Sequence, residues 1–312
     1  MNDCKKGQKQ MVHQIKNEQL IIDIAEIGSY RGSRFDRSGF ITGVTLMNGE
    51  QGRHTFCVPE SLVSGEGTGG AGLCNEFGIK KAIGYEDAEV GEQFLKLGVG
   101  LLTRIDNEEY AFHRSYPISP LQVQVEQENA SKLVFRSVQE ECRGFAVELT
   151  KSVSISQNRL MVEYELVNTG TREICTDEYC HNFIGIDGHD IGPDYLLKFP
   201  FELNPWNDDL TTMEDLVVGS EAGMAKVGWR RKPDKPFYFQ QLGFEVSRHD
   251  WLWELLHQPS GVGVREISSL KVSDVAVWGQ GHVVSPEIFT EVKVAPGQRQ
   301  VWSRVYEFFI EP

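Results

Sequence analysis

The run Leu160-Met-Val-Glu-Tyr-Glu-Leu-Val167 alternates apolar and polar side chains through most of its length, and shorter runs at 121–126 and 133–138 repeat the pattern. Alternation with a period of two, carried by β-branched and aromatic residues, is typical of a strand that buries one face. Helical periodicity is scarce. Only Asp87 to Leu97 and Thr211 to Ala222 are expected to form helices, and both are short. The chain is therefore predicted to be all-β.

Turn residues separate these runs, at Asn48-Gly49, Gln157-Asn158, Asn168-Thr169-Gly170 and Pro296-Gly297. The last of these turns joins two alternating runs into a hairpin near the C-terminus. No low-complexity linker and no fixed-period repeat divides the chain. We expect a large antiparallel β-supersandwich with few short helices, formed by residues 20–312 as one domain after a polar N-terminal extension at 1–19.

Composition narrows the classes of function. The 312 residues contain 45 acidic and 31 basic side chains, which gives a net charge of −14. Such a charge repels nucleic acids and anionic membrane surfaces, so neither is expected as a partner. The N-terminus lacks the apolar core of a signal peptide, and no apolar stretch is long enough for a membrane helix. Six cysteines without CxxC pairs indicate free thiols, so we expect a cytoplasmic protein.

The segment Asp177 to Asp187 contains the first candidate for acid–base chemistry. In an extended backbone Tyr179, His181 and Phe183 share one face. A histidine held between aromatic side chains can titrate near neutral pH, which suits a proton donor. The local pattern alone favours a structural histidine in the core.

A second candidate lies between Trp278 and Phe289. Pro286 cannot donate to a ladder, so a strand is expected to restart at Glu287, whose side chain then shares a polar face with Phe289. Gln280 and His282 precede it in an expected loop. The alternative is the solvated face of an edge strand.

Two glycine-containing segments complete the set. Residues 30–39 include arginines, hydroxyl side chains and two glycines, which could bind a polyhydroxylated ligand, although this segment alone is better explained by a charged surface turn. Residues 65–79 are rich in glycine but lack the lysine and serine or threonine of a P-loop and the spacing of a dinucleotide-binding motif. We interpret this second segment as a mobile loop beside a site.

Together these segments resemble the galactose mutarotase-like (aldose 1-epimerase) superfamily over about residues 20–312. The resemblance rests on the order and spacing of several short motifs, none decisive alone. They are Gly32-Ser33-Arg34, the glycine-rich stretch Gly69-Gly70 through Phe77-Gly78, His181-Asn182-Phe183, Pro259-Ser260-Gly261-Val262, Trp278-Gly279 and Glu287.

The resemblance implies an isomerase that interconverts the α and β anomers of a monosaccharide or sugar derivative. It implies that His181 is the general acid toward the ring oxygen and Glu287 the base for the anomeric hydroxyl, with no metal or other cofactor. The expected substrate contacts are Arg34, Glu76, Arg104, Tyr179, Asp250, Trp278, Gln280 and His282. A phosphorylated sugar would be expected to contact Arg31 and Lys96. A monomer or a homodimer is expected.

Two departures from the family pattern bear on the substrate. Cys180 stands where relatives carry an asparagine, and the stretch Lys96 to Gly100 lacks an earlier histidine that touches the sugar; the candidates to replace that histidine are His113, Glu76 and Lys96. The alternatives are a non-catalytic carbohydrate-binding protein and a saccharide lyase or hydrolase using the same cleft. A third alternative is a metal site built from His181, Asp187, His189, Asp190 and Asp194.

Overall fold

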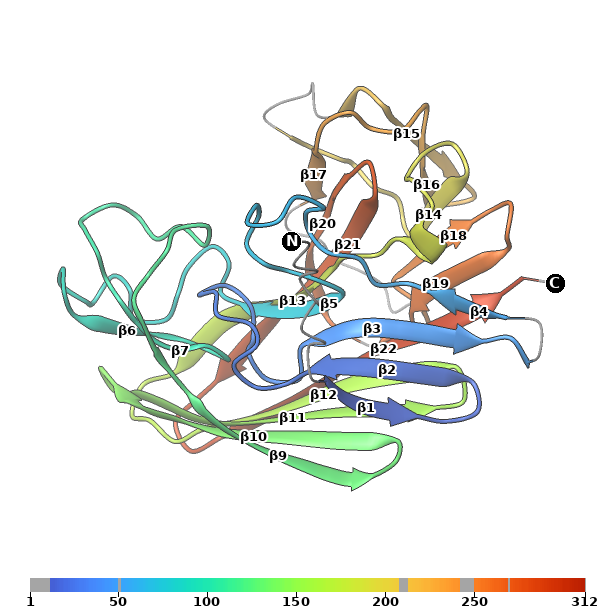
Figure 1. The fold of residues 1–312 in the computed structure, drawn as a ribbon. Coiled ribbons are helices and arrows are strands. Elements are labelled where there is room, and N and C mark those ends of the chain that lie inside the picture. Colours follow the sequence, from blue (N-terminus) through green and yellow to red (C-terminus); the bar gives the residue numbers. More distant parts are fainter. Residues whose placement is uncertain (1–11, 50–51, 208–212, 242–249, 269, 312) are drawn as a thin grey trace, which may run out of the picture.

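The computed structural model describes residues 12–49, 52–207, 213–241, 250–268 and 270–311 (Figure 1). Its strands form three antiparallel sheets. The nine-stranded sheet has the order β1-β2-β3-β5-β13-β21-β20-β17, with β4 paired to β3. Its strands are β1 (Val12–Lys16), β2 (Leu20–Ala25), β3 (Ile41–Met47), β4 (Arg53–Thr55), β5 (Leu73–Phe77), β13 (Ile174–Asn182), β17 (Phe237–Gln241), β20 (Val272–Gln280) and β21 (Val283–Val294).

The ten-stranded sheet has the order β15-β16-β14-β18-β19-β22-β12-β11-β10-β9. Its strands are β9 (Gln122–Asn129), β10 (Lys132–Cys142), β11 (Phe145–Ser156), β12 (Arg159–Asn168), β14 (Tyr195–Phe199), β15 (Leu216–Glu221), β16 (Met224–Trp229), β18 (Trp253–His257), β19 (Val262–Glu266) and β22 (Arg299–Ile310). A small third sheet, at one end of the molecule in Figure 1, contains β6 (Gln93–Lys96), β7 (Gly100–Thr103) and β8 (Ile118–Pro120).

The two large sheets pack face to face around one apolar core. Along β12, Leu160, Val162, Tyr164 and Leu166 are buried while the residues between them are more exposed, as the alternating sequence predicted. These side chains belong to one cluster with residues of the opposite sheet, such as Ile22. The all-β antiparallel sandwich expected from the sequence is therefore confirmed.

The central strands β13 and β21 separate over part of their length. They pair from Ile174–Val294 to Glu178–Thr290, and an isolated bridge joins Ile184 to Val284 further along. Between these two points the backbones diverge, and a side-chain hydroxyl replaces a ladder partner: the backbone N–H of Asn182 donates to Oγ of Ser285 at 2.9 Å. The candidate site lies over this opening.

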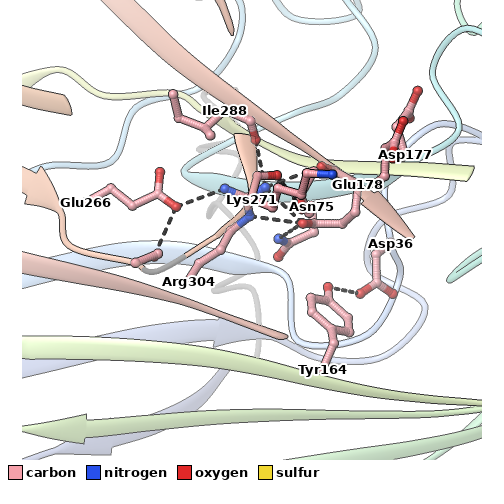
Figure 2. Close-up of polar contacts among 12 residues, drawn as sticks. Asp36, Asn75, Tyr164, Asp177, Glu178, Glu266, Lys271, Ile288 and Arg304 are labelled. Atoms are coloured by element: carbon pink, nitrogen blue, oxygen red, sulfur yellow. Dashed lines mark hydrogen bonds and ion pairs between the residues drawn. The ribbon is translucent and has the colours of Figure 1, made fainter. Parts of the chain in front are cut away.

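Arg304 of β22 fills the opening from the core side (Figure 2). Its guanidinium is fully buried and donates to the carboxylates of Glu178 and Glu266 at 2.9–3.1 Å. It also donates to two backbone carbonyl oxygens, those of Ile288 on β21 at 2.7 Å and Glu178 on β13 at 3.4 Å. One side chain thus donates to a backbone carbonyl of each strand at the point where their ladder ends.

Pro286 lies inside this opening, and the expectation that a strand restarts after it is wrong. β21 runs unbroken through Pro286, which pairs with Val277 of β20. The carbonyl of Pro286 accepts from Nδ2 of Asn182 at 2.5 Å, so it faces β13. In an antiparallel strand the N–H and C=O of one residue point to the same side. The backbone nitrogen of Pro286, which carries no hydrogen, therefore also faces the opening, where β13 offers it no backbone acceptor.

The two short helices expected from the sequence are not formed. The stretch from Asp87 to Leu97 contains turns and β6, and it is interrupted by Gly91 at a φ of +90°. The described part of the second stretch contains β15, which forms a hairpin with β16 through a turn at Ala222 and Gly223, both with positive φ. β-branched residues in β15 favour a strand there. A 3₁₀ turn, Ile186–Gly188, is the helical element that lies wholly within the described residues.

Three further observations concern the chain as a whole. β1, which lies within the expected N-terminal extension, pairs along its length with β2 and so belongs to the first sheet; residues 1–11 lie outside the described residues. The described cysteines are free thiols, at 57, 74, 142, 175 and 180. Within the described part of the chain, no helix is long and apolar enough to cross a bilayer.

Candidate active site

A cavity of about 720 Å³ opens on the face of the nine-stranded sheet that points away from the main core. This volume lies within the range that small-molecule sites occupy. Strands β13, β21, β20 and β17 supply its floor, and the segment 110–113 forms a wall. The described residues that line it are Arg34, Glu60, Thr68, Ile79, Lys80, Tyr110, Ala111, Phe112, His113, His181, Tyr238, Gln240, Asp274, Val275, Ala276, Trp278, Glu287 and Phe289.

His181 and Glu287 meet in this cavity, as the sequence predicted. Nε2 of His181 lies 3.2 Å from Oε1 of Glu287, and each residue is only 4% exposed. The imidazole stacks on Phe183 with ring centres 4.0 Å apart and meets the edge of Trp278 at 5.2 Å. The carboxyl group of Glu287 also accepts from Oγ of Ser285 at 3.1 Å. Packing therefore fixes both groups in one geometry.

Burial shifts the two groups in opposite directions. It raises the pKa of Glu287 to about 8, and nearby Arg34 only partly offsets this. It lowers the pKa of His181 well below its ordinary value, with a further contribution from Arg34. Nδ1 of His181 is buried and has no hydrogen-bond partner among the described residues, so an imidazolium would leave one N–H unsatisfied. Near neutral pH, the unliganded pair therefore holds its proton on Glu287 beside a neutral imidazole.

Arg34 lies on the other side of the cavity and is held by several partners. Its guanidinium donates to Glu76 at 2.8 Å, to Tyr179 at 2.9 Å and to Thr68 at 3.1 Å. It also packs 4.3 Å from the ring centre of Phe112. This packing fixes the direction in which its remaining N–H groups point, so Arg34 is a prepositioned donor toward the cavity.

Glu76 and Tyr179, expected as substrate contacts, lie behind Arg34. Both are fully buried and do not line the cavity. The hydroxyl of Tyr179 donates to Glu76 at 2.6 Å, and buried Lys96 donates to the same carboxylate at 3.1 Å. One carboxylate thus compensates two cations, which explains why strand β5 carries a glutamate at a buried position. These residues support Arg34 rather than reach a ligand.

The other expected contacts divide into one that lines the cavity and four that do not. Trp278 lines it, whereas Arg104 donates to backbone carbonyls of residues 85, 88 and 106. Asp250 is exposed and outside the lining. Gln280 and His282 donate to the backbone carbonyls of residues 60 and 59, respectively. They hold the segment that carries Glu60 into the cavity.

Several lining residues were missed by the sequence interpretation. Oε2 of Glu60 accepts from the backbone N–H groups of Thr68 and Gly70 at 2.6 and 3.2 Å, which fastens the glycine-rich loop beside the cavity. The segment 110–113, Tyr-Ala-Phe-His, is an aromatic cluster in an otherwise polar stretch, and that contrast was the available signal. Its His113 lines the cavity, whereas Lys96 is buried beneath it.

The alternative metal site is not assembled. Among the described residues, no group of three or more His, Cys, Asp or Glu side chains is placed to hold a metal ion. Asp187 instead contacts His54 at 2.7 Å, and His189 stacks on His257 with ring centres 4.2 Å apart. The residues that looked like ligands in sequence have other partners.

Comparisons with known proteins identify the fold. Neither a family model nor a curated protein matches the chain in sequence. Among solved structures, it resembles a galactose mutarotase-like protein from Lactobacillus casei (TM-score 0.59, 13% identity, 96% of this chain and 100% of that one). It also resembles a galactose mutarotase related enzyme from Lactobacillus acidophilus (0.57, 11%, 97% and 100%). An aldose epimerase homologue from C. elegans is similar to the same degree (0.58, 10%, 97% and 99%). The chain has the galactose mutarotase-like fold.

Proposed function

We propose that the protein interconverts the α and β anomers of a sugar by acid–base opening of the pyranose ring. The observation that carries the proposal is the buried His181–Glu287 contact of 3.2 Å on the cavity floor, with pKa values shifted in opposite directions. Anomer exchange needs one group that gives a proton and one that takes a proton at the same time. The likeness to solved mutarotase-like structures supports the same reading of the cavity.

The geometry suits this reaction because both reacting oxygens are attached to one carbon. One member of the pair takes the proton of the anomeric hydroxyl while the other protonates the ring oxygen, and the bond between the ring oxygen and the anomeric carbon breaks. The free aldehyde rotates about its C1–C2 bond. The reverse transfers then close the ring on the other face of the carbonyl and return both protons, so the pair ends in its starting state.

The electrostatics of the unliganded pair favour Glu287 as the donor and His181 as the acceptor. Glu287 holds its proton up to a pH of about 8, whereas His181 stays neutral well below its ordinary pKa. This is the reverse of the assignment that the family resemblance implies. The two assignments use the same residues and the same number of protons, and they differ in which of the two groups holds the proton before the reaction.

Arg34 and Trp278 are the proposed substrate contacts. The guanidinium of Arg34 can donate to ring hydroxyl oxygens, and the indole of Trp278 offers an apolar surface beside His181. Besides the reacting pair, the lining carries acidic groups at Glu60 and Asp274 and basic ones at Arg34 and Lys80. This balance favours a neutral sugar over a phosphorylated one.

Saturation-transfer NMR of anomer exchange tests the proposal directly. Glucose, galactose, their 6-phosphates and common uronic acids are each compared with and without protein. The matched variants are His181→Asn in the cavity and His257→Asn, a histidine that is 5% exposed and does not line it. Faster exchange that His181→Asn abolishes and His257→Asn keeps supports the proposal. No acceleration of any sugar contradicts it and favours a carbohydrate-binding protein.

A further inference from the structure

The floor of the cavity extends sideways from Glu287 across the sheet. In the strand register Glu287 of β21 pairs with Ala276 of β20, and Ala276 pairs with Gln240 of β17. All three line the cavity. Neighbouring strands are about 4.8 Å apart, so this row continues roughly 10 Å beyond the reacting pair. The floor is therefore wider than a single pyranose ring held over His181 requires.

The row ends at an exposed tryptophan. Trp206 and Gln240 exchange both backbone hydrogen bonds at 2.9 Å, which makes them directly opposite partners in an isolated bridge. Directly opposite residues of an antiparallel pair project their side chains on the same face. Trp206 thus lies on the cavity face and is 51% exposed. A tryptophan this exposed is unusual, because its large ring is normally buried.

The row carries a short side chain beside aromatic ones. Ala276 is the smallest member and lies next to Trp278 in the alternation of β20, with Tyr238 opposite Trp278 on β17. This short side chain lies beside two aromatic ones, and all three line the cavity. Gln240 adds a planar amide, to which the hydroxyl of Tyr238 donates at 2.8 Å. Aromatic borders with a few polar groups are typical of sites for small polar rings.

We propose that this row is a subsite for a second sugar residue. The reducing ring of a neutral disaccharide or longer oligosaccharide lies over His181 and Glu287, and the next ring lies over Ala276 toward Trp206. The reaction assigned to the reducing ring rests on the proposed function, whereas binding of the second ring does not. Among the described residues that line the cavity, the one arginine is Arg34, and it already pairs with Glu76, which favours a neutral occupant over a phosphate.

The test compares Trp206→Ala with Val301→Ala, a control whose side chain is also 51% exposed and lies on β22 of the other sheet. Two quantities are measured for each protein. One is kcat/KM for anomer exchange of glucose, galactose, maltose, cellobiose and lactose. The other is the Kd of each sugar from NMR titration. The expected result is tighter binding and higher kcat/KM for at least one disaccharide than for its parent monosaccharide. Trp206→Ala removes that advantage, about tenfold, and leaves the monosaccharide values and those of Val301→Ala unchanged.

The outcomes separate the two proposals. Acceleration of monosaccharides with no advantage for any disaccharide overturns the subsite and leaves the proposed function standing. Disaccharide binding that depends on Trp206 without any acceleration supports the subsite and contradicts the proposed function. An advantage that persists in Trp206→Ala shows that the second ring binds elsewhere, and it also overturns the subsite.

Discussion

Strands β13 and β21 bury a carboxyl group on each face, and the two groups have opposite surroundings. On the core face, Glu178 of β13 receives the fork of Arg304 and a further bond from Nδ2 of Asn75 at 2.8 Å. On the cavity face, Glu287 of β21 is similarly buried but has only the hydroxyl of Ser285 and neutral His181 beside it. The core face compensates its charges so that the chain can fold. The cavity face leaves its carboxyl group short of partners, and a proton stays on it.

The largest effect is expected from removing Arg304, the cation that compensates the buried carboxylates of the core face. Arg304→Met leaves Glu178 and Glu266 buried without their cation, so we expect the free energy of unfolding to fall by about 3–5 kcal/mol, or no folded protein to be recovered. Urea denaturation measures the change. Arg136→Met, which breaks an exposed pair with Glu126, serves as the control and should cost less than about 1 kcal/mol. Equal costs for the two variants would show that the core network does not hold the strands.

The same amide substitution on each face sharpens the comparison. Glu287→Gln is expected to lower kcat/KM by about 10²–10⁴-fold with little loss of stability, because a neutral amide suits an apolar position at least as well as a buried carboxyl group. Glu178→Gln should instead destabilise the fold, because Arg304 loses a charged partner. Polarimetry and thermal unfolding are measured on both. A stable, inactive Glu178→Gln protein would argue against the division between the faces.

The pH dependence of the rate tests the protonation states of Glu287 and His181 on the cavity face. If Glu287 gives the proton, its protonated form is the active one, so kcat/KM falls as pH rises through about 8. The rate should stay level down to below the ordinary pKa of histidine, because His181 remains neutral there. Initial rates corrected for buffer catalysis provide the profile. A rate that rises through pH 8 would contradict an active form that carries one proton on the pair.

The smallest expected effect concerns the binding wall. Arg34→Lys keeps the charge but cannot reproduce the fork that joins Glu76, Tyr179 and Thr68. We expect KM to rise by about tenfold while kcat changes by less than threefold, because Arg34 orients the sugar without taking part in proton transfer. Steady-state kinetics separates the two constants. A fall in kcat with constant KM would indicate that Arg34 acts on the transition state alone.

The sequence predicted the sandwich because alternation is a local signal, and β12 buries the residues that the pattern indicated. The strand patterns made His181 and Glu287 candidates, but only the family resemblance gave them catalytic roles, because each local pattern also fitted a structural residue. Which side chains pair across the sandwich depends on residues that are distant in sequence. Arg304 looks like one polar position in a terminal hairpin, and only the packing of β22 under β13 and β21 reveals its role.

The same limit explains the misassigned contacts. Glu76 and Tyr179 have polar groups that suggested ligand contacts, yet both are fully buried and hydrogen-bonded to Arg34. Arg104, Gln280 and His282 are polar residues whose backbone partners lie far away in sequence or around a turn. Their types suggested ligand binding, and their neighbours in space give them structural roles.

Pro286 also constrains how the chain can assemble. When β13 and β21 come together during folding, each paired residue normally recruits the next, and the ladder spreads until a donor is missing. Pro286 lacks that donor on the side facing β13. Whichever end of the ladder forms first, backbone pairing between β13 and β21 therefore cannot continue across the opening. The opening that Arg304 and the reacting pair require is thus determined by the backbone of Pro286 before any of their side chains pack.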